Sequence, residues 1–146
     1  MQFILRIDPE KEEEVVAQVH KESEFTDKLQ ALVRQGEGLN TFYGYDEGDI
    51  HLLSIEKAEA FFTAEDKTYA VMDDGRMYRI RCRLYELEEK LPAQFIRISK
   101  SAIANRRAMA RLETQLSGAV NVVFKSGYVD YVSRRCFADM KRRYGL

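Results

Sequence analysis

From residue 46 onward, the chain alternates between short β-type segments and turn sequences, and this pattern constrains the fold more than any other feature. The segments are rich in Ile, Val, Phe and Tyr and cover residues 50–55, 60–63, 68–72, 77–82, 95–98, 109–116, 120–124 and 128–132. Asp73-Asp74-Gly75 separates two of them and has the composition of a hairpin turn. The pattern predicts a small β domain with many short strands.

Two segments of this region have helical spacing of their apolar residues instead, namely residues 83–91 and residues 134–144. Pro92 ends the first predicted helix, whereas Ser133 caps the second and Gly145 ends it. Residues 99–101 and 102–105 are expected to form a turn or a tight helical piece. We therefore expect only a few short helices among the strands.

Residues 1–45 have a different pattern, which predicts a strand followed by a helix. Phe3–Ile7 alternates well enough for a short strand. Asp8 and Pro9 suit the N-cap and the first helical position, so a helix is expected to start there and to end at Gly36 or Gly38. We expect a packing helix with an acidic solvated face; the alternative is a helix for dimerisation or partner docking. These patterns divide the chain into two predicted parts, an N-terminal strand–helix extension (1–45) and a domain (46–146).

Charge is distributed unevenly along the chain, although the net charge is only −1. Residues 95–146 contain eleven Lys/Arg and three Asp/Glu, a net charge of +8. Residues 1–50 contain five Lys/Arg and twelve Asp/Glu, a net charge of −7. A basic half that also has sheet and helix patterns is typical of a protein that binds a polyanion, most simply nucleic acid.

The sequence argues against several other classes of protein. No apolar run approaches the roughly 18 residues of a membrane span, and the first residues do not form a signal peptide, so we expect a cytoplasmic protein. Cys82 and Cys136 form no CxxC pair and have no neighbouring His, which disfavours a zinc site or a disulfide framework. His20 and His51 are isolated and no catalytic motif is present, so we expect no enzymatic activity and no cofactor.

Three basic groups lie in predicted connections or at a helix start. Ser133-Arg134-Arg135 opens the last predicted helix, where the helix dipole and free backbone N–H groups favour phosphate. Lys100 lies between two serines after a strand, and Lys67 lies in a turn between two strands. Each group alone is more often an ordinary solvated charge, so their significance depends on whether the fold brings them together.

Three stretches of the sequence resemble one family of DNA-binding domains. Residues 95–105, FIRISKSAIAN, resemble the pattern F-x-R-x-H-[basic/N]-S-x-x-V-N. Residues 55–62, IEKAEAFF, resemble its strand entry, and residues 131–135, YVSRR, resemble the closing V-S-R-R before the final helix. From about Asp49 to the C-terminus, roughly two thirds of the chain, the sequence resembles the LytTR DNA-binding domain of LytR/AlgR-type bacterial transcription regulators.

This resemblance implies a fold and a function. The fold is mostly β (α+β overall), with about ten short antiparallel strands in small sheets and few short helices. Such a domain binds double-stranded DNA through loops that enter successive major grooves and contact the backbone between them. We therefore expect a sequence-specific transcriptional regulator.

The resemblance also implies roles for single residues, carried over by position. Lys67 lies in the first loop that faces DNA, Lys100 lies in the second, and Arg135 lies at the start of the final helix. Lys100 and Arg135 are expected to contact bases. The residues expected to contact phosphate or to support these loops are Ser101, Arg97, Arg134 and Lys125.

Two features depart from the family pattern. The first is Ser99, which stands where the family usually has His. Asn105, by contrast, matches the family pattern and is expected to hold a turn. Only about 45 residues precede the match, fewer than a receiver domain needs, so the chain resembles the stand-alone regulators of the family. In such regulators a signal can arrive through a partner, often a small membrane protein. We expect a homodimer or a cooperative pair on repeated DNA sites.

Two other functions remain as alternatives. One is a protein-interaction module, in which the acidic N-terminal helix and the basic C-terminal half bind other proteins or each other; the acidic segment could then compete with DNA. The other is RNA binding through stacked Tyr and Phe side chains, although most of these lie at alternating strand positions that a small β domain needs for its core.

Overall fold

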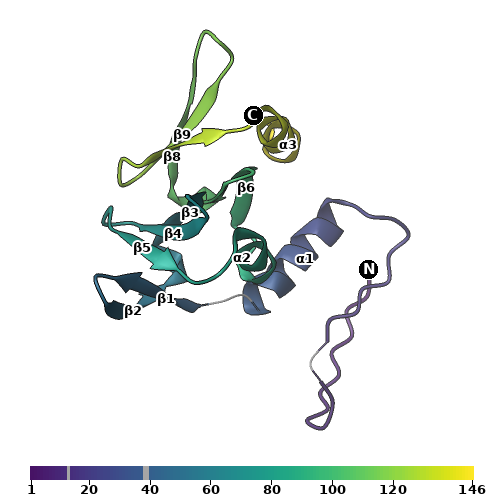
Figure 1. Cartoon of the computed structure of the whole chain (residues 1–146). Helices are drawn as coiled ribbons and strands as arrows, with labels where there is room; N and C mark the ends of the chain where they lie inside the picture. Colours follow the sequence, from purple (N-terminus) through teal and green to yellow (C-terminus); the bar gives the residue numbers. More distant parts are fainter. Residues whose placement is uncertain (13, 38–39) are drawn as a thin grey trace.

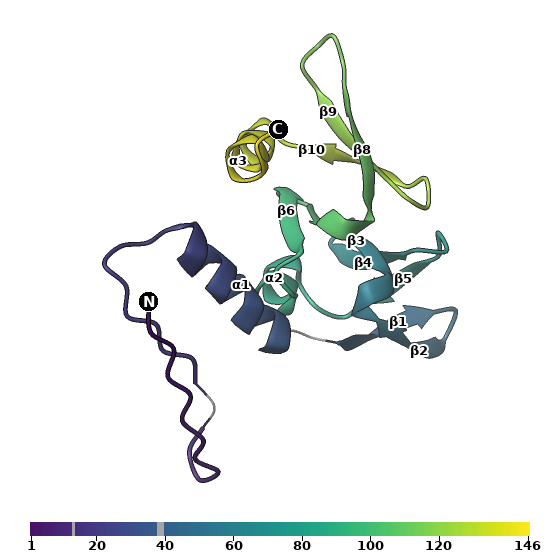
Figure 2. The same ribbon diagram turned by 180° about the vertical axis from the view of Figure 1, so that it is seen from behind.

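The computed structural model describes residues 1–12, 14–37 and 40–146 and is mostly β, with ten strands and three α-helices in that part of the chain (Figures 1 and 2). The strands are β1 Thr41–Asp46, β2 Asp49–Ser54, β3 Ala58–Ala64, β4 Lys67–Met72, β5 Met77–Ile80, β6 Phe95–Ser99, β7 Ala102–Asn105, β8 Met109–Thr114, β9 Val120–Phe124 and β10 Val129–Val132. The helices are α1 Glu24–Glu37, α2 Leu84–Lys90 and α3 Arg134–Tyr144, with short 3-10 turns at Ile55–Lys57 and Arg106–Ala108. The predicted fold class is confirmed.

Seven strands form one antiparallel sheet in the order β2-β1-β5-β4-β3-β7-β6. Tight hairpins account for much of this order, because β1–β2, β3–β4 and β4–β5 are each joined by a short turn with a residue at positive φ. Gly44 lets β1 approach β5 closely, since a Cβ at this position would lie 2.7 Å from the Cβ of Tyr78.

The remaining strands form a second sheet in the order β10-β9-β8, and α3 follows directly from β10. One core lies between α2 and the seven-stranded sheet, with Phe61, Ile103, Leu84 and Leu87 among its buried residues. The other core lies on the opposite face and consists of residues of the central strands, of the second sheet and of α3. The second sheet and α3 therefore cover the part of this face that is formed by β4, β3, β7 and β6.

A buried carboxylate ties the two sheets together. Glu59 lies at a bulge in β3 and is only 1% exposed. Its carboxylate accepts hydrogen bonds from the Ser126 hydroxyl and from the Ser126 backbone N–H, the latter at 3.0 Å. In the same turn, the Lys125 N–H donates to the carbonyl of Ala108 at 3.0 Å. The β9–β10 turn is thereby fixed against the start of β3.

Several expectations for the N-terminal part are wrong. Phe3–Ile7 forms no strand, and α1 begins at Glu24 rather than at Asp8-Pro9. Local sequence favours a cap at Asp8, but the following residues find no core, and helices of this length depend on tertiary packing. Thr26 instead organises the start of α1, because its hydroxyl accepts a hydrogen bond from the Ser23 N–H at 2.9 Å. Gly36 lies inside α1, while Gly38 lies outside the described residues.

Two further differences concern strands. Residues 102–105 form β7 rather than a turn or a helical piece, because all four are buried between β3 and β6. Strand β1 was not anticipated, and it crosses the predicted boundary between residues 1–45 and 46–146. The division of the chain into these two parts remains a prediction.

Candidate nucleic-acid interface

The first basic residue of the candidate site, Lys67, lies at the start of β4 and is exposed. A two-residue turn joins β3 to β4, and both of its residues, Glu65 and Asp66, have positive φ (51° and 62°). Such a turn gives a tight hairpin in which Ala64 faces Lys67. Lys67 is therefore held at the tip of a rigid hairpin.

The second segment is the two-residue turn between β6 and β7, which contains Lys100 and Ser101, both exposed. The Ser99 hydroxyl accepts a hydrogen bond from the Ser101 N–H at 3.2 Å and lies 3.4 Å from the Ser101 hydroxyl. Ser99, which replaces the usual His, thus supports the turn from inside and is itself buried.

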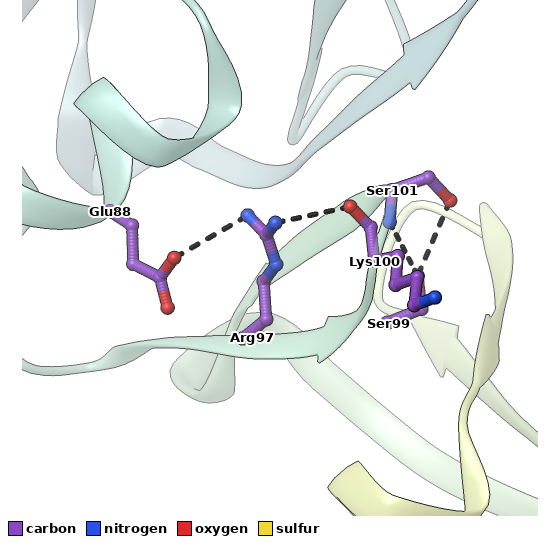
Figure 3. A network of polar contacts seen from close by, with 5 residues as sticks. All are labelled: Glu88, Arg97, Ser99, Lys100 and Ser101. Carbon is purple, nitrogen blue, oxygen red and sulfur yellow. Dashed lines mark hydrogen bonds and ion pairs between the residues drawn. The ribbon is translucent and has the colours of Figure 1, made fainter.

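Arg97 supports the same turn from the other side (Figure 3). One guanidinium nitrogen donates to the Lys100 carbonyl at 3.1 Å, and the other lies 3.5 Å from the Glu88 carboxylate. The nitrogen near Glu88 is buried and has no partner with hydrogen-bond geometry, so the contact with Glu88 is an ion pair only. The Arg97 guanidinium therefore holds the Lys100 carbonyl. Of the two roles expected for Arg97, contact with phosphate or support of a loop, this geometry favours support.

The third segment is the start of α3, where Arg134 and Arg135 are the first two helical residues and are exposed. The Ser133 hydroxyl caps the helix by accepting a hydrogen bond from the Cys136 N–H at 3.2 Å. Unpaired backbone N–H groups and the positive end of the helix dipole lie at this terminus, together with two guanidinium groups. The arrangement suits a phosphate group or the edge of a base.

Two backbone hydrogen bonds place these three segments side by side. The Thr63 N–H donates to the carbonyl of Ser101 at 2.8 Å, which joins the β3–β4 hairpin to the β6–β7 turn. The Ser133 N–H donates to the carbonyl of Ile98 at 2.8 Å, which joins the start of α3 to the end of β6. We call the resulting row the basic edge and define it by Lys67, Lys100, Ser101, Arg134 and Arg135.

The basic edge spans several strands, and its charges have no ion-pair partners among the described residues. From β4 through β3, β7 and β6 to Ser133 there are four strand spacings of about 4.8 Å, or roughly 19 Å, and long side chains extend this reach at both ends. Within the described part of the chain, none of Lys67, Lys100, Arg134 and Arg135 forms an ion pair. Their charges are thus available to an external anion.

Lys125 is the one predicted site residue that lies apart from this edge. It is exposed in the β9–β10 turn, which Glu59 and Ala108 fix near the start of β3, whereas the basic edge adjoins the end of β3. In Figure 1 this yellow-green turn lies on the opposite side of the second sheet from α3. The structure therefore brings six of the seven predicted residues to one region and leaves Lys125 outside it.

Asn105 has the structural role expected for it. Its side-chain N–H donates to the carbonyl of Ala58 at 2.9 Å, and its side-chain oxygen accepts from the Arg107 N–H at 3.1 Å. Sequence reasoning missed Thr63 and Ile98, which act through backbone groups alone and carry no side-chain signal. It also missed Glu59, which resembles a solvated strand residue in the sequence but is buried at a bulge.

Comparison with known proteins identifies the family. Residues 48–145 match the LytTR family, described as the LytTr DNA-binding domain. The chain belongs to the LytTR DNA-binding domain family. A solved LytTr DNA-binding domain from Bacillus cereus has the same fold, with a TM-score of 0.69 at 18% identity, and the match covers 75% of this chain and 100% of that chain.

Similar proteins of about the same length occur in Staphylococcus aureus. An uncharacterized HTH-type transcriptional regulator of strain MSSA476 is 29% identical over 139 residues, which are 93% of this chain and 93% of that protein. Another, from bovine strain RF122 / ET3-1, is 30% identical over 123 residues, 82% of this chain and 83% of that protein. The described α-helices of the present LytTR chain are each separated by strands, so no helix-turn-helix occurs among them.

Proposed function

We propose that this chain is a sequence-specific transcriptional regulator that binds double-stranded DNA through the basic edge. The observation that carries the proposal is the pair of backbone hydrogen bonds, Thr63 to Ser101 and Ser133 to Ile98, that hold three basic segments in one row. The family match supports DNA as the ligand, and the names of the staphylococcal relatives support a role in transcription.

Each residue of the edge has a role that fits its position. Lys100, at the centre, and Arg135, at the helix start, contact base edges in the major groove, where both residue types recognise guanine. Lys67, Arg134 and Ser101 contact phosphates on either side, and Arg97 holds the central turn. Lys125 contacts phosphate only if the duplex bends toward the β9–β10 turn.

The proposal includes the setting in which the regulator works. It acts in the cytoplasm as a homodimer or cooperative pair on repeated sites, and a small membrane protein is a candidate source of its signal. Among the described residues, no helix combines the length and the apolar character needed to traverse a bilayer. The protein-interaction alternative is not favoured, because the family match accounts for the basic half of the chain.

The test is fluorescence-anisotropy binding of the full chain to duplex DNA from upstream of its own gene and from other promoters, with scrambled duplexes as controls, across a salt series. About five to seven phosphate contacts give a slope of about −4 to −6 in log affinity against log salt. Preference for one duplex with this slope supports the proposal. Equal binding to every duplex, or no binding at low salt, contradicts it.

A further inference from the structure

Part of the seven-stranded sheet is uncovered and apolar. On β1 and β2, Tyr43 faces Leu52 and Tyr45 faces Ile50, and these residues point away from the face that carries Phe42 and the ring pair His51–Tyr78. Tyr43, Ile50, Leu52 and Met77 are 61%, 64%, 65% and 47% exposed. We call this surface the bare face. Arg79 and Arg81 lie on its β5 side, and Asp46 and Glu47 lie at the β1–β2 turn that borders it.

The bare face adjoins an unpaired sheet edge. Strand β2 is the last strand of the sheet, so one side of its backbone has no partner strand among the described residues. The opposite edge, at β6, is covered because Ser133 bonds to Ile98 and α3 follows. An uncovered edge beside exposed apolar side chains is a site where another strand can pair.

The same chain carries a segment with matching chemistry. Phe3, Leu5 and Ile7 are 86%, 71% and 86% exposed, and in an extended conformation all three would lie on one side. Residues 8–14 then contain five Asp/Glu and one Lys. On the β5 side of the bare face the charges are those of Arg79 and Arg81, and the Arg81 guanidinium carbon lies 4.2 Å from the centre of the Tyr45 ring.

We infer that residues 3–8 of a second copy of this chain pair with the free edge of β2 and place Phe3, Leu5 and Ile7 on the bare face. The acidic residues that follow Ile7 would complement Arg79 and Arg81 of the bare face. In both views the N-terminal segment and β2 lie on opposite sides of the molecule with α1 between them, which favours exchange between copies over folding back (Figures 1 and 2). Reciprocal exchange closes a dimer.

The test is sedimentation equilibrium of the full chain over a concentration series, with three substitutions. Phe3→Asp changes the segment and Leu52→Lys changes the bare face. Leu116→Lys is the matched control, because Leu116 is fully exposed in the turn between β8 and β9. All three positions are exposed, so the variants should keep the melting temperature of the wild type.

A concentration-dependent dimer is expected, weakened about tenfold to a hundredfold by Phe3→Asp and by Leu52→Lys and unchanged by Leu116→Lys. A monomer at all concentrations, or a dimer indifferent to both substitutions, overturns the inference. Amide exchange of β2 gives a second way to overturn the inference. If exchange is slow in a monomer and becomes fast in Phe3→Asp, the segment docks on the sheet of its own chain. Neither substitution touches the basic edge, so affinity for a single-site duplex reports on DNA binding independently.

Discussion

Replacing Ser126 by Ala tests how the two sheets, and with them the basic edge, are held in place. The substitution removes the hydroxyl that donates to Glu59 but leaves the backbone N–H bond of 3.0 Å intact. A hydrogen bond to a charged group contributes about 1.5–3 kcal/mol, and solvent screens this one little because Glu59 is 1% exposed. We therefore expect Ser126→Ala to lower the free energy of unfolding by about 1.5–3 kcal/mol. This corresponds to a decrease of about 3–12 °C in melting temperature.

The chain offers a matched control in Ser117→Ala. Ser117, like Ser126, precedes a glycine at positive φ in a hairpin turn, but its hydroxyl only accepts a 3.4 Å bond from the Ala119 N–H at the surface. Urea unfolding followed by circular dichroism should show a change below about 0.5 kcal/mol for this variant. If Ser126→Ala costs no more than Ser117→Ala, the Glu59 link does not stabilise the fold and the reasoning fails.

Three further predictions concern supporting residues. Arg97→Met should weaken binding to the preferred duplex. It should change the free energy of unfolding by less than about 1 kcal/mol, because the ion pair of Arg97 with Glu88 is partly exposed. Unchanged DNA affinity would remove Arg97 from the site. Asn105→Ala leaves a buried carbonyl without its partner and should cost about 1–3 kcal/mol in urea unfolding, and a cost below 0.5 kcal/mol would contradict this. Burial, with help from Asp130, raises the pKa of the Tyr128 phenol above its usual 10.0. The folded state therefore favours the neutral phenol, and stability should fall as pH rises above about 10; Tyr128→Phe should flatten this fall, and an equally steep fall would contradict it.

Much of the fold could be predicted from local pattern because short hairpins are local structures. The turn at Asp73-Asp74-Gly75 and the strands on both sides of it follow from residue types that lie next to each other in the chain. Helix α1 could not be placed in this way, since its start depends on which residues find a core. Strand β7 was missed because small residues such as Ala102 and Ala104 have weak strand propensity and are fixed by burial between neighbouring strands.

The candidate site could be predicted only in part. Its basic side chains are visible in the sequence, whereas their arrangement depends on backbone groups of Thr63 and Ile98 that have no sequence signature. The resemblance of residues 95–105 to a family pattern supplied the missing spatial information. It could not reveal that Lys125 lies apart, because that position depends on the buried contact between Glu59 and Ser126.

The central claim is that DNA binds at the basic edge, and the most direct test compares Lys100→Ala and Arg135→Ala with Arg76→Ala. Arg76 is an exposed arginine in the β4–β5 turn. This turn is bonded to Lys57, directly before the start of β3, and thus lies away from the edge. Affinity for the preferred duplex should fall by about 1–3 kcal/mol, or roughly 5- to 150-fold, for each edge variant and remain unchanged for Arg76→Ala. Equal affinities for all three variants would contradict the account.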